Sequence, residues 1–238
     1  MVSAADPIEP ALRFAVVGYA ARLPGSPDAD AFWDLLREGR DAISEVPADR
    51  WESFRIDSPE AAAALAGTTR WGSFLRDVDA FDAEFFEISP SEADKMDPQQ
   101  RLLLEVTHEA LEHAGIPAHS LRHTQTGVFA AACLGEYGYL STTDLGDVDS
   151  WSGTGGALSI IANRVSYFFD FRGPSMAIDT ACSSALVAVH EGMKALRAGD
   201  ADVVLAGGVN ALITPLVTLG FDEVGGVLAS DGRIKSFS

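Results

Sequence analysis

Short apolar runs alternate with amphipathic stretches along most of this chain. Runs of a few consecutive apolar residues are typical of strands buried on both faces of a parallel sheet. The sequence predicts four such strands, at residues 14–17, 127–133, 176–178 and 203–206. It predicts helices at 29–38, 97–115, 153–169 and 183–198. Strands that alternate with helices indicate an α/β fold, layered around a mainly parallel sheet.

The chain of 238 residues, 47% of them hydrophobic, suits one domain with a full core. We expect residues 1–12 to be a flexible lead-in and 13–238 to form the domain, with an irregular, aromatic-rich excursion at 40–95. The first ten residues carry acidic side chains and no apolar run, which argues against a secretory signal. The longest apolar stretch, 203–217, holds Asn210 and Pro215 and is too short for a membrane span.

The charge balance narrows the range of partners. Lys and Arg number 17 against 35 Asp and Glu, so the net charge is −18. Binding to nucleic acid or to an anionic membrane needs clustered cations, so neither is expected. Two cysteines, Cys133 and Cys182, are too few for a disulfide scaffold, which favours a reducing cytoplasm.

Cys182 lies in the sharpest local feature, D-T-A-C-S-S at 179–184, between a short predicted strand and a long predicted helix. At the start of a helix, free N–H groups and the helix dipole favour a thiolate and could help to hold an oxyanion. Helical spacing puts Cys182 on one face with residues 185, 186, 189, 193 and 196, so its sulfur is expected to point inward. A small buried structural cysteine is the alternative interpretation.

The histidines offer neither a metal site nor a base for this thiol. His108 and His113 are five residues apart, which turns the second about 140° around a helix, so the pair cannot chelate one metal. His190 lies about 12 Å along the helix from Cys182, too far to act as its base. His119 and His123 fall in a polar loop. Dinucleotide, P-loop and G-x-S-x-G motifs are absent from the sequence.

Several longer motifs resemble the ketosynthase domain of type I polyketide synthases, within the β-ketoacyl synthase family. They are F-D-A-E-F-F at 81–86, D-P-Q-Q-R at 97–101, E-A-L-E at 109–112, N-R-V-S-Y at 163–167, G-P-S at 173–175 and the D-T-A-C-S-S segment. His108 stands where the family commonly has tryptophan, and Ala185 where it commonly has a third serine. Segments between 210 and 237 look like the subgroup that condenses two long acyl chains into mycolic acids.

The resemblance implies a thiolase-like α-β-α fold in which Cys182 is the acyl-accepting catalytic residue. An acyl group would arrive on the phosphopantetheine of an acyl carrier protein, and a malonyl-type thioester would lose CO₂ and attack the acyl-Cys182 thioester. The backbone N–H of Cys182 would be one oxyanion donor. No bound cofactor is implied, and relatives work as homodimers that pair near residues 176–178.

The sequence lacks the H-G-T-G-T and N-x-G-H contexts in which the family carries two catalytic histidines. We therefore expect the N-terminal half of a ketosynthase, inactive in condensation without the remaining half. Two other interpretations stay open. One is a non-catalytic truncated or scaffold fragment, and the other is a thiolase-like acyltransferase that uses acyl-CoA without decarboxylation.

Overall fold

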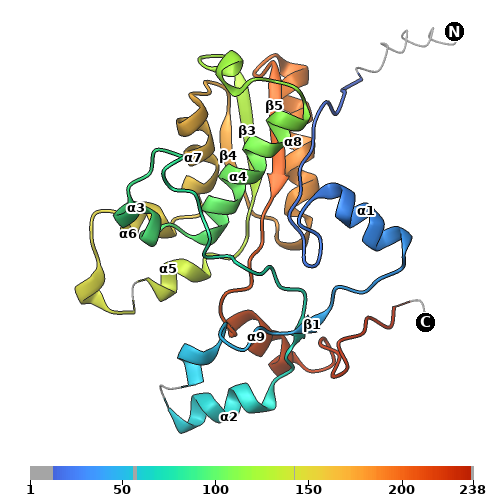
Figure 1. Ribbon diagram of the computed structural model, residues 1–238, viewed down its shortest axis with the longest axis vertical. Coiled ribbons are helices and arrows are strands. Elements are labelled where there is room, and N and C mark those ends of the chain that lie inside the picture. The colour runs from blue at the N-terminus through green and yellow to red at the C-terminus, as the bar shows by residue number, and fades with distance from the viewer. Residues whose placement is uncertain (1–12, 56–57, 142, 237–238) are drawn as a thin grey trace, which may run out of the picture.

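The computed structural model describes residues 13–55, 58–141 and 143–236, so the expected lead-in at 1–12 lies outside the described residues. Its centre is a parallel sheet of β3 (Thr126–Ala131), β4 (Ser175–Ile178) and β5 (Val203–Gly208), in the order β4-β3-β5 (Figure 1). Every residue of the central strand β3 is buried. Val128 pairs with Ser175 on one side and with Leu205 on the other. The prediction of an α/β fold with a parallel sheet is confirmed.

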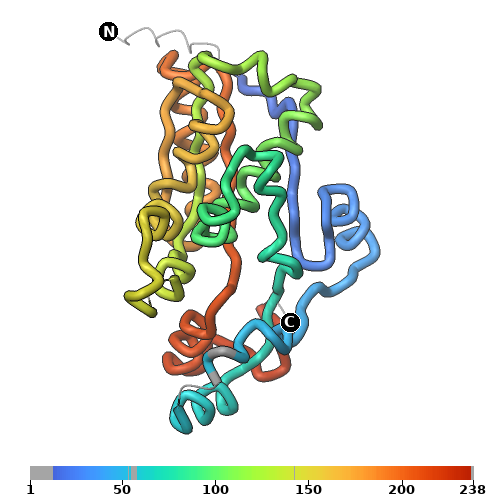
Figure 2. Tube along the Cα trace, turned by 60° about the vertical axis from the view of Figure 1, so that its left-hand side comes forward, coloured from blue at the N-terminus to red at the C-terminus, as the bar shows by residue number. Residues whose placement is uncertain are grey.

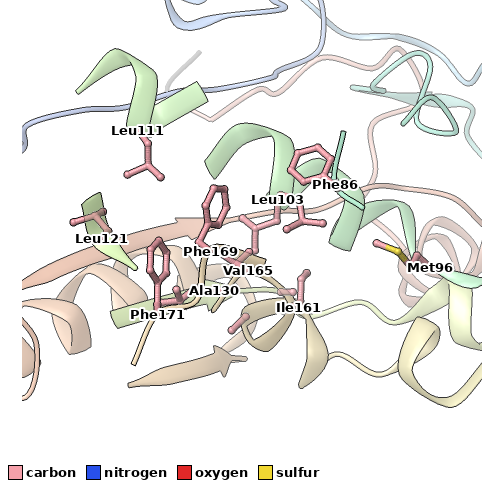
Figure 3. Packing of buried hydrophobic residues seen from close by; sticks show 14 residues of the cluster. Phe86, Met96, Leu103, Leu111, Leu121, Ala130, Ile161, Val165, Phe169 and Phe171 are labelled. Carbon is pink, nitrogen blue, oxygen red and sulfur yellow. The ribbon is translucent and has the colours of Figure 1, made fainter. Parts of the chain in front are cut away.

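Successive side chains of β3 belong to two separate cores, because successive residues of a strand face opposite sides of the sheet. Val128 and Ala130 face the core built with α4 (Pro98–His113) and α7 (Ile160–Phe169). Figure 3 shows side chains of both helices gathered near Ala130. Phe129 and Ala131 pack instead against α8 (Ser184–Ala198). Helices therefore cover both faces of the sheet, as the expected α-β-α layering requires.

The face of α8 that lies on the sheet is made of small residues. Ala188 and Ala195 are buried, and a Cβ added to Gly192 would lie 2.6 Å from Cγ1 of Val204. The larger apolar side chains are exposed: Leu186, Val189 and Met193. The predicted inward face is therefore wrong for Cys182, which is also exposed. A helix that approaches a sheet this closely has room only for small side chains, so its larger ones turn away.

A second, smaller core lies below the sheet and joins distant parts of the chain. It contains Val46, Trp51, Leu65 and Phe74, with Leu212 packed against them. Figure 2 shows the C-terminal segment beside the early one at this end of the molecule. The described part of the excursion at 40–95 carries short elements: β1 (Ser44–Glu45), the 3₁₀ helix Glu52–Arg55, α2 (Pro59–Gly67), β2 (Trp71–Gly72) and α3 (Pro90–Lys95). The remaining helices are α1 (Ala29–Arg37), α5 (Glu136–Leu140), α6 (Ser152–Gly156) and α9 (Leu216–Val224).

The predicted strand at 14–17 is wrong. The segment has no regular secondary structure, and Val16 and Val17 are 87% and 63% exposed. Just beyond it, Arg22 forms ion pairs with Glu105 and Glu109 of α4. An apolar run becomes a strand only if it can join the edge of a sheet, and neither β4 nor β5 pairs with this one.

The predicted helix at 153–169 is interrupted. The chain forms α6 and α7 with a break at 157–159. A Cβ on Gly155 would lie 1.9 Å from the carbonyl oxygen of Lys95, so α6 lies directly against the end of α3. This contact with a segment far away in the sequence sets the direction of α6, and helical periodicity alone could not reveal it. Within the described residues, no helix has the length and apolar character that crossing a membrane would need.

Candidate active site at the carboxyl edge of the sheet

The carboxyl ends of the three parallel strands meet at one edge of the sheet. Pairing continues past the strands themselves, because Ala132 N donates to the carbonyl of Ile178 at 3.2 Å and Val209 N donates to the carbonyl of Ala131 at 3.0 Å. The residues that leave this edge are 133 after β3, 179 after β4 and 209 after β5. This edge is where open α/β sheets commonly bind ligands.

A tight turn between β4 and α8 presents Cys182. Ala181, the residue before it, has φ +53°, a left-handed conformation that costs energy for a residue with a Cβ. The Asp179 carboxylate accepts a hydrogen bond from Ala181 N at 3.0 Å. Ser184 Oγ accepts from Thr180 N at 2.8 Å and donates to the Ala181 carbonyl at 2.7 Å. The turn is thus held by its own polar side chains in a strained shape, as is common at functional sites.

The thiol of Cys182 has the surroundings that a nucleophile needs. It is exposed, and it lies in the 3₁₀ turn Ala181–Ser183 that leads directly into α8. The first N–H groups of a helix lack intrahelical partners and carry partial positive charge. An oxyanion that forms on a carbonyl oxygen bound at this position is therefore stabilised by the helix.

The second cysteine lies at the same edge of the sheet, which sequence reasoning missed. Cys133 is partly buried, two residues beyond the end of β3. Burial raises the pKa of the Cys133 thiol, and the charges of Asp179 and Cys182 raise it further. The two thiols therefore lie within electrostatic range of each other. The signal was present in the sequence, because Cys133 ends one predicted parallel strand and Cys182 closely follows another.

Gln99 joins two of the segments that leave the edge. Gln99 is 1% exposed and lies in the first turn of α4. Asp97 caps this helix, because its carboxylate accepts a hydrogen bond from Gln99 N at 2.8 Å. Gln99 Nε2 donates to the carbonyl of Leu134 at 2.6 Å, and its Oε1 accepts from Ala211 N at 3.2 Å. Leu134 follows β3 and Ala211 follows β5, so one amide side chain sets their separation.

Glu136 fixes the chain beyond β5. Its carboxylate is 3% exposed and accepts three hydrogen bonds, from Ile213 N at 2.9 Å, from Thr214 N at 3.0 Å and from Thr214 Oγ1 at 2.9 Å. A buried carboxylate with this many donors is a rigid anchor. Gln99 and Glu136 together, here called the Gln99–Glu136 clamp, hold the loops that follow β3 and β5 to one another.

The histidines whose contacts are defined have partners outside this turn. His108 faces Glu112 at 3.5 Å, and the ring of His113 lies 4.2 Å from that of Tyr19. His123 precedes β3, at the opposite end of the sheet from the Cys182 turn. Among the residues that the structure describes, no group of three or more His, Cys, Asp or Glu side chains could hold a metal ion.

Comparison with known proteins identifies the architecture around this turn. Residues 12–238 match the family model "Beta-ketoacyl synthase, N-terminal domain". The chain is 62% identical over 224 residues to one of the phenolphthiocerol/phthiocerol polyketide synthase subunits of Mycobacterium tuberculosis. It is 47% identical over 224 residues to the 6-methylsalicylic acid synthase of Penicillium terrestre. Each match covers 94% of this chain and 12% of the relative, so the chain spans about an eighth of their length.

Solved structures show the same likeness. An oxazolomycin ketosynthase domain of Streptomyces albus JA3453 superposes with a TM-score of 0.82 at 42% identity, over 93% of this chain and 38% of that one. The ketosynthase from module 6 of the bacillaene synthase of Bacillus subtilis 168 superposes with a TM-score of 0.76 at 34% sequence identity. The match covers 91% of this chain and 35% of that one. The expected N-terminal half of a thiolase-like fold is confirmed. The chain belongs to the β-ketoacyl synthase family and corresponds to the N-terminal domain of a polyketide synthase ketosynthase.

Proposed function

We propose that Cys182 carries the growing acyl chain as a thioester during decarboxylative Claisen condensation. The observation that supports this most directly is its exposed thiol, at the start of α8 on a strained turn. In the first step the sulfur of Cys182 attacks the carbonyl of an acyl group held on carrier-protein phosphopantetheine. The new C–S bond forms, the bond to the carrier sulfur breaks, and the carrier leaves as a thiol. Such covalent catalysis divides one difficult transfer into two easier ones.

The second step makes the carbon–carbon bond. A malonyl-type thioester on a carrier protein loses CO₂, and the electron pair of the broken C–C bond forms an enolate. The enolate carbon attacks the acyl-Cys182 carbonyl, the C–S bond breaks, and Cys182 leaves as a thiolate. The backbone N–H of Cys182 stabilises the oxyanion on the acyl carbon. Stabilising the enolate falls to groups outside residues 1–238, because the sequence lacks both histidine motifs of the family.

Two surfaces of the chain support the expected partners. The exposed apolar side of α8, at Leu186 and Val189, and the outer edge of β5, with which no described strand pairs, suit coverage by the remaining half of the ketosynthase. The outer edge of β4 likewise has no partner among the residues that the structure describes, and it suits pairing with a second copy. Met176 on this strand is 42% exposed, and Tyr167 of α7 is 89% exposed. We place the enzyme in a reducing cytoplasm, where both thiols stay free.

The experiment is acyl loading followed by intact-protein mass measurement. Acyl carrier proteins charged with acetyl, propionyl or long-chain groups are incubated with the chain and with its Cys182→Ser and Cys133→Ser variants. We expect one acyl adduct, lost in Cys182→Ser and kept in Cys133→Ser. An adduct that survives in Cys182→Ser contradicts the proposal, and the absence of any adduct favours the scaffold interpretation. A preference for long chains supports the mycolate-like subgroup, and loading of short chains alone refutes it.

Condensation is tested separately, by the formation of β-ketoacyl product from acyl- and malonyl-carrier proteins. We expect no turnover from residues 1–238 alone and turnover when the second half is supplied. General acid–base groups contribute typically about 10²–10⁴-fold, so their absence should be decisive. Robust turnover by the chain alone would mean that a described residue supplies the missing chemistry.

A further inference from the structure

The two cysteines of the chain are brought together by strand register. Ala131 pairs with Ile178, and the hydrogen bond from Ala132 N to Ile178 continues the ladder by one residue. Neighbouring strands lie about 4.8 Å apart, so the backbone of Cys133 lies beside the first residues after β4. Cys182 follows only four residues after Ile178 and sits in a turn. The charge of Cys182 also acts on the Cys133 thiol, so the two side chains lie near each other. A disulfide between them requires Cα atoms about 4.4–6.8 Å apart.

The two thiols have different environments. Cys182 is exposed at the start of α8, where reagents have access to its sulfur. Cys133 is partly buried, and its raised pKa keeps it protonated near neutral pH. An oxidant therefore meets Cys182 first, and Cys133 remains as an unreacted thiol beside it.

We propose that Cys133 and Cys182 form a dithiol pair that closes to a disulfide when a hydroperoxide oxidises Cys182. The Cys182 thiolate attacks the outer oxygen of the hydroperoxide, giving a sulfenic acid and, from hydrogen peroxide, hydroxide. The sulfur of Cys133 then attacks the sulfenic sulfur, the S–S bond forms, and water leaves with the thiol proton. Two thiols and one hydrogen peroxide thus become one disulfide and two waters, a two-electron oxidation of the pair.

This chemistry gives the site a reversible oxidised state. A sulfenic acid without a neighbouring thiol proceeds to sulfinic acid, which is not recovered by ordinary thiols. A disulfide stops the oxidation at a stage that a dithiol reductant reverses. The consequence for activity rests on the proposed function, because a disulfide would leave Cys182 unable to accept an acyl group. The pairing itself depends only on the positions and environments of the two thiols.

The test treats the reduced chain with hydrogen peroxide and maps its peptides without reduction. We expect the chain to lose both free thiols together, with a loss of two hydrogen atoms and a cross-linked pair of peptides that contain residues 133 and 182. Dithiothreitol should restore both thiols. Cys133→Ser should instead gain two or three oxygen atoms at Cys182 and should not recover. Phenylarsine oxide, which bridges two adjacent thiols, should bind the wild-type chain and neither serine variant.

Three outcomes overturn the proposal. They are oxygen addition at Cys182 in the wild type while Cys133 stays free, disulfides only between chains, and equal recovery of the wild type and Cys133→Ser. Repeating the oxidation in denaturant controls for chance pairing, since a folded pair should close faster than an unfolded one. Acyl loading of Cys133→Ser separates this proposal from the proposed function, because loading can succeed whether or not the disulfide forms.

Discussion

Replacing Ala181 by glycine should stabilise the chain, although glycine usually weakens a fold. Ala181 has φ +53°, and the left-handed region costs a residue with a Cβ about 1–2 kcal/mol. Glycine avoids that cost but loses about 0.5–1 kcal/mol more backbone entropy on folding. The difference predicts that Ala181→Gly raises the free energy of unfolding by about 0.75 kcal/mol, the midpoint of a range of about 0–1.5 kcal/mol.

The matched control is Ala63→Gly, at an exposed position inside α2, where only the entropy loss applies. It should lower the free energy of unfolding by about 0.5–1 kcal/mol, so the two variants should differ in sign. Urea denaturation gives both values, and thermal melting should separate them by about 2–4 °C for each kcal/mol. If Ala181→Gly destabilises the chain as much as the control does, then the turn before Cys182 is not strained and this reasoning fails.

Three other predictions concern the clamp, the packing of α6 and the thiols. Glu136→Ala should lower the free energy of unfolding by about 3–5 kcal/mol, because it removes three hydrogen bonds from buried donors. Glu136→Gln should lower it less. If urea denaturation gives equal losses for the two variants, the carboxylate of Glu136 is not an anchor. Gly155→Ala should lower the melting temperature sharply because its Cβ would meet a backbone carbonyl at 1.9 Å, whereas Gly153→Ala, with open space around it, should have little effect. Iodoacetamide should label Cys182 faster than Cys133 near neutral pH. The labelling rate of Cys133 should increase only at higher pH, because its raised pKa delays formation of its thiolate. Equal labelling rates of the two cysteines in folded protein would refute this prediction.

Helix boundaries could be predicted because the signals that set them are local. Asp97 and Pro98 begin α4, and Gly199 ends α8 at φ +78°, as their types and positions in the sequence indicate. The strands of the sheet were also predictable, since runs of buried apolar residues have few alternatives in an alternating pattern. The resemblance to ketosynthases then located Cys182, and the structure places it at the predicted start of a helix.

What the sequence could not reveal depends on contacts between distant segments. The clamp joins Glu136 to Thr214 across 78 positions, and no periodicity records such a pairing. The orientation of α8 was misjudged because helical spacing identifies an apolar stripe without saying which side faces the sheet. Close packing of α8 on the sheet at Gly192 leaves room only for small side chains, so the face with the small residues lies on the sheet and the larger apolar residues are exposed.

The position of β3 in the sheet also governs how the chain must fold as it leaves the ribosome. Val128 can complete its ladders only after Ser175 and then Leu205 have been synthesised. At about 5–20 residues per second, the wait between Val128 and Leu205 is about 4–15 seconds. Throughout that time at least one edge of an apolar strand destined for complete burial stays unpaired. A nascent chain in this state is a natural client for a chaperone that binds extended apolar segments, and slowing translation between β3 and β5 should prolong that dependence.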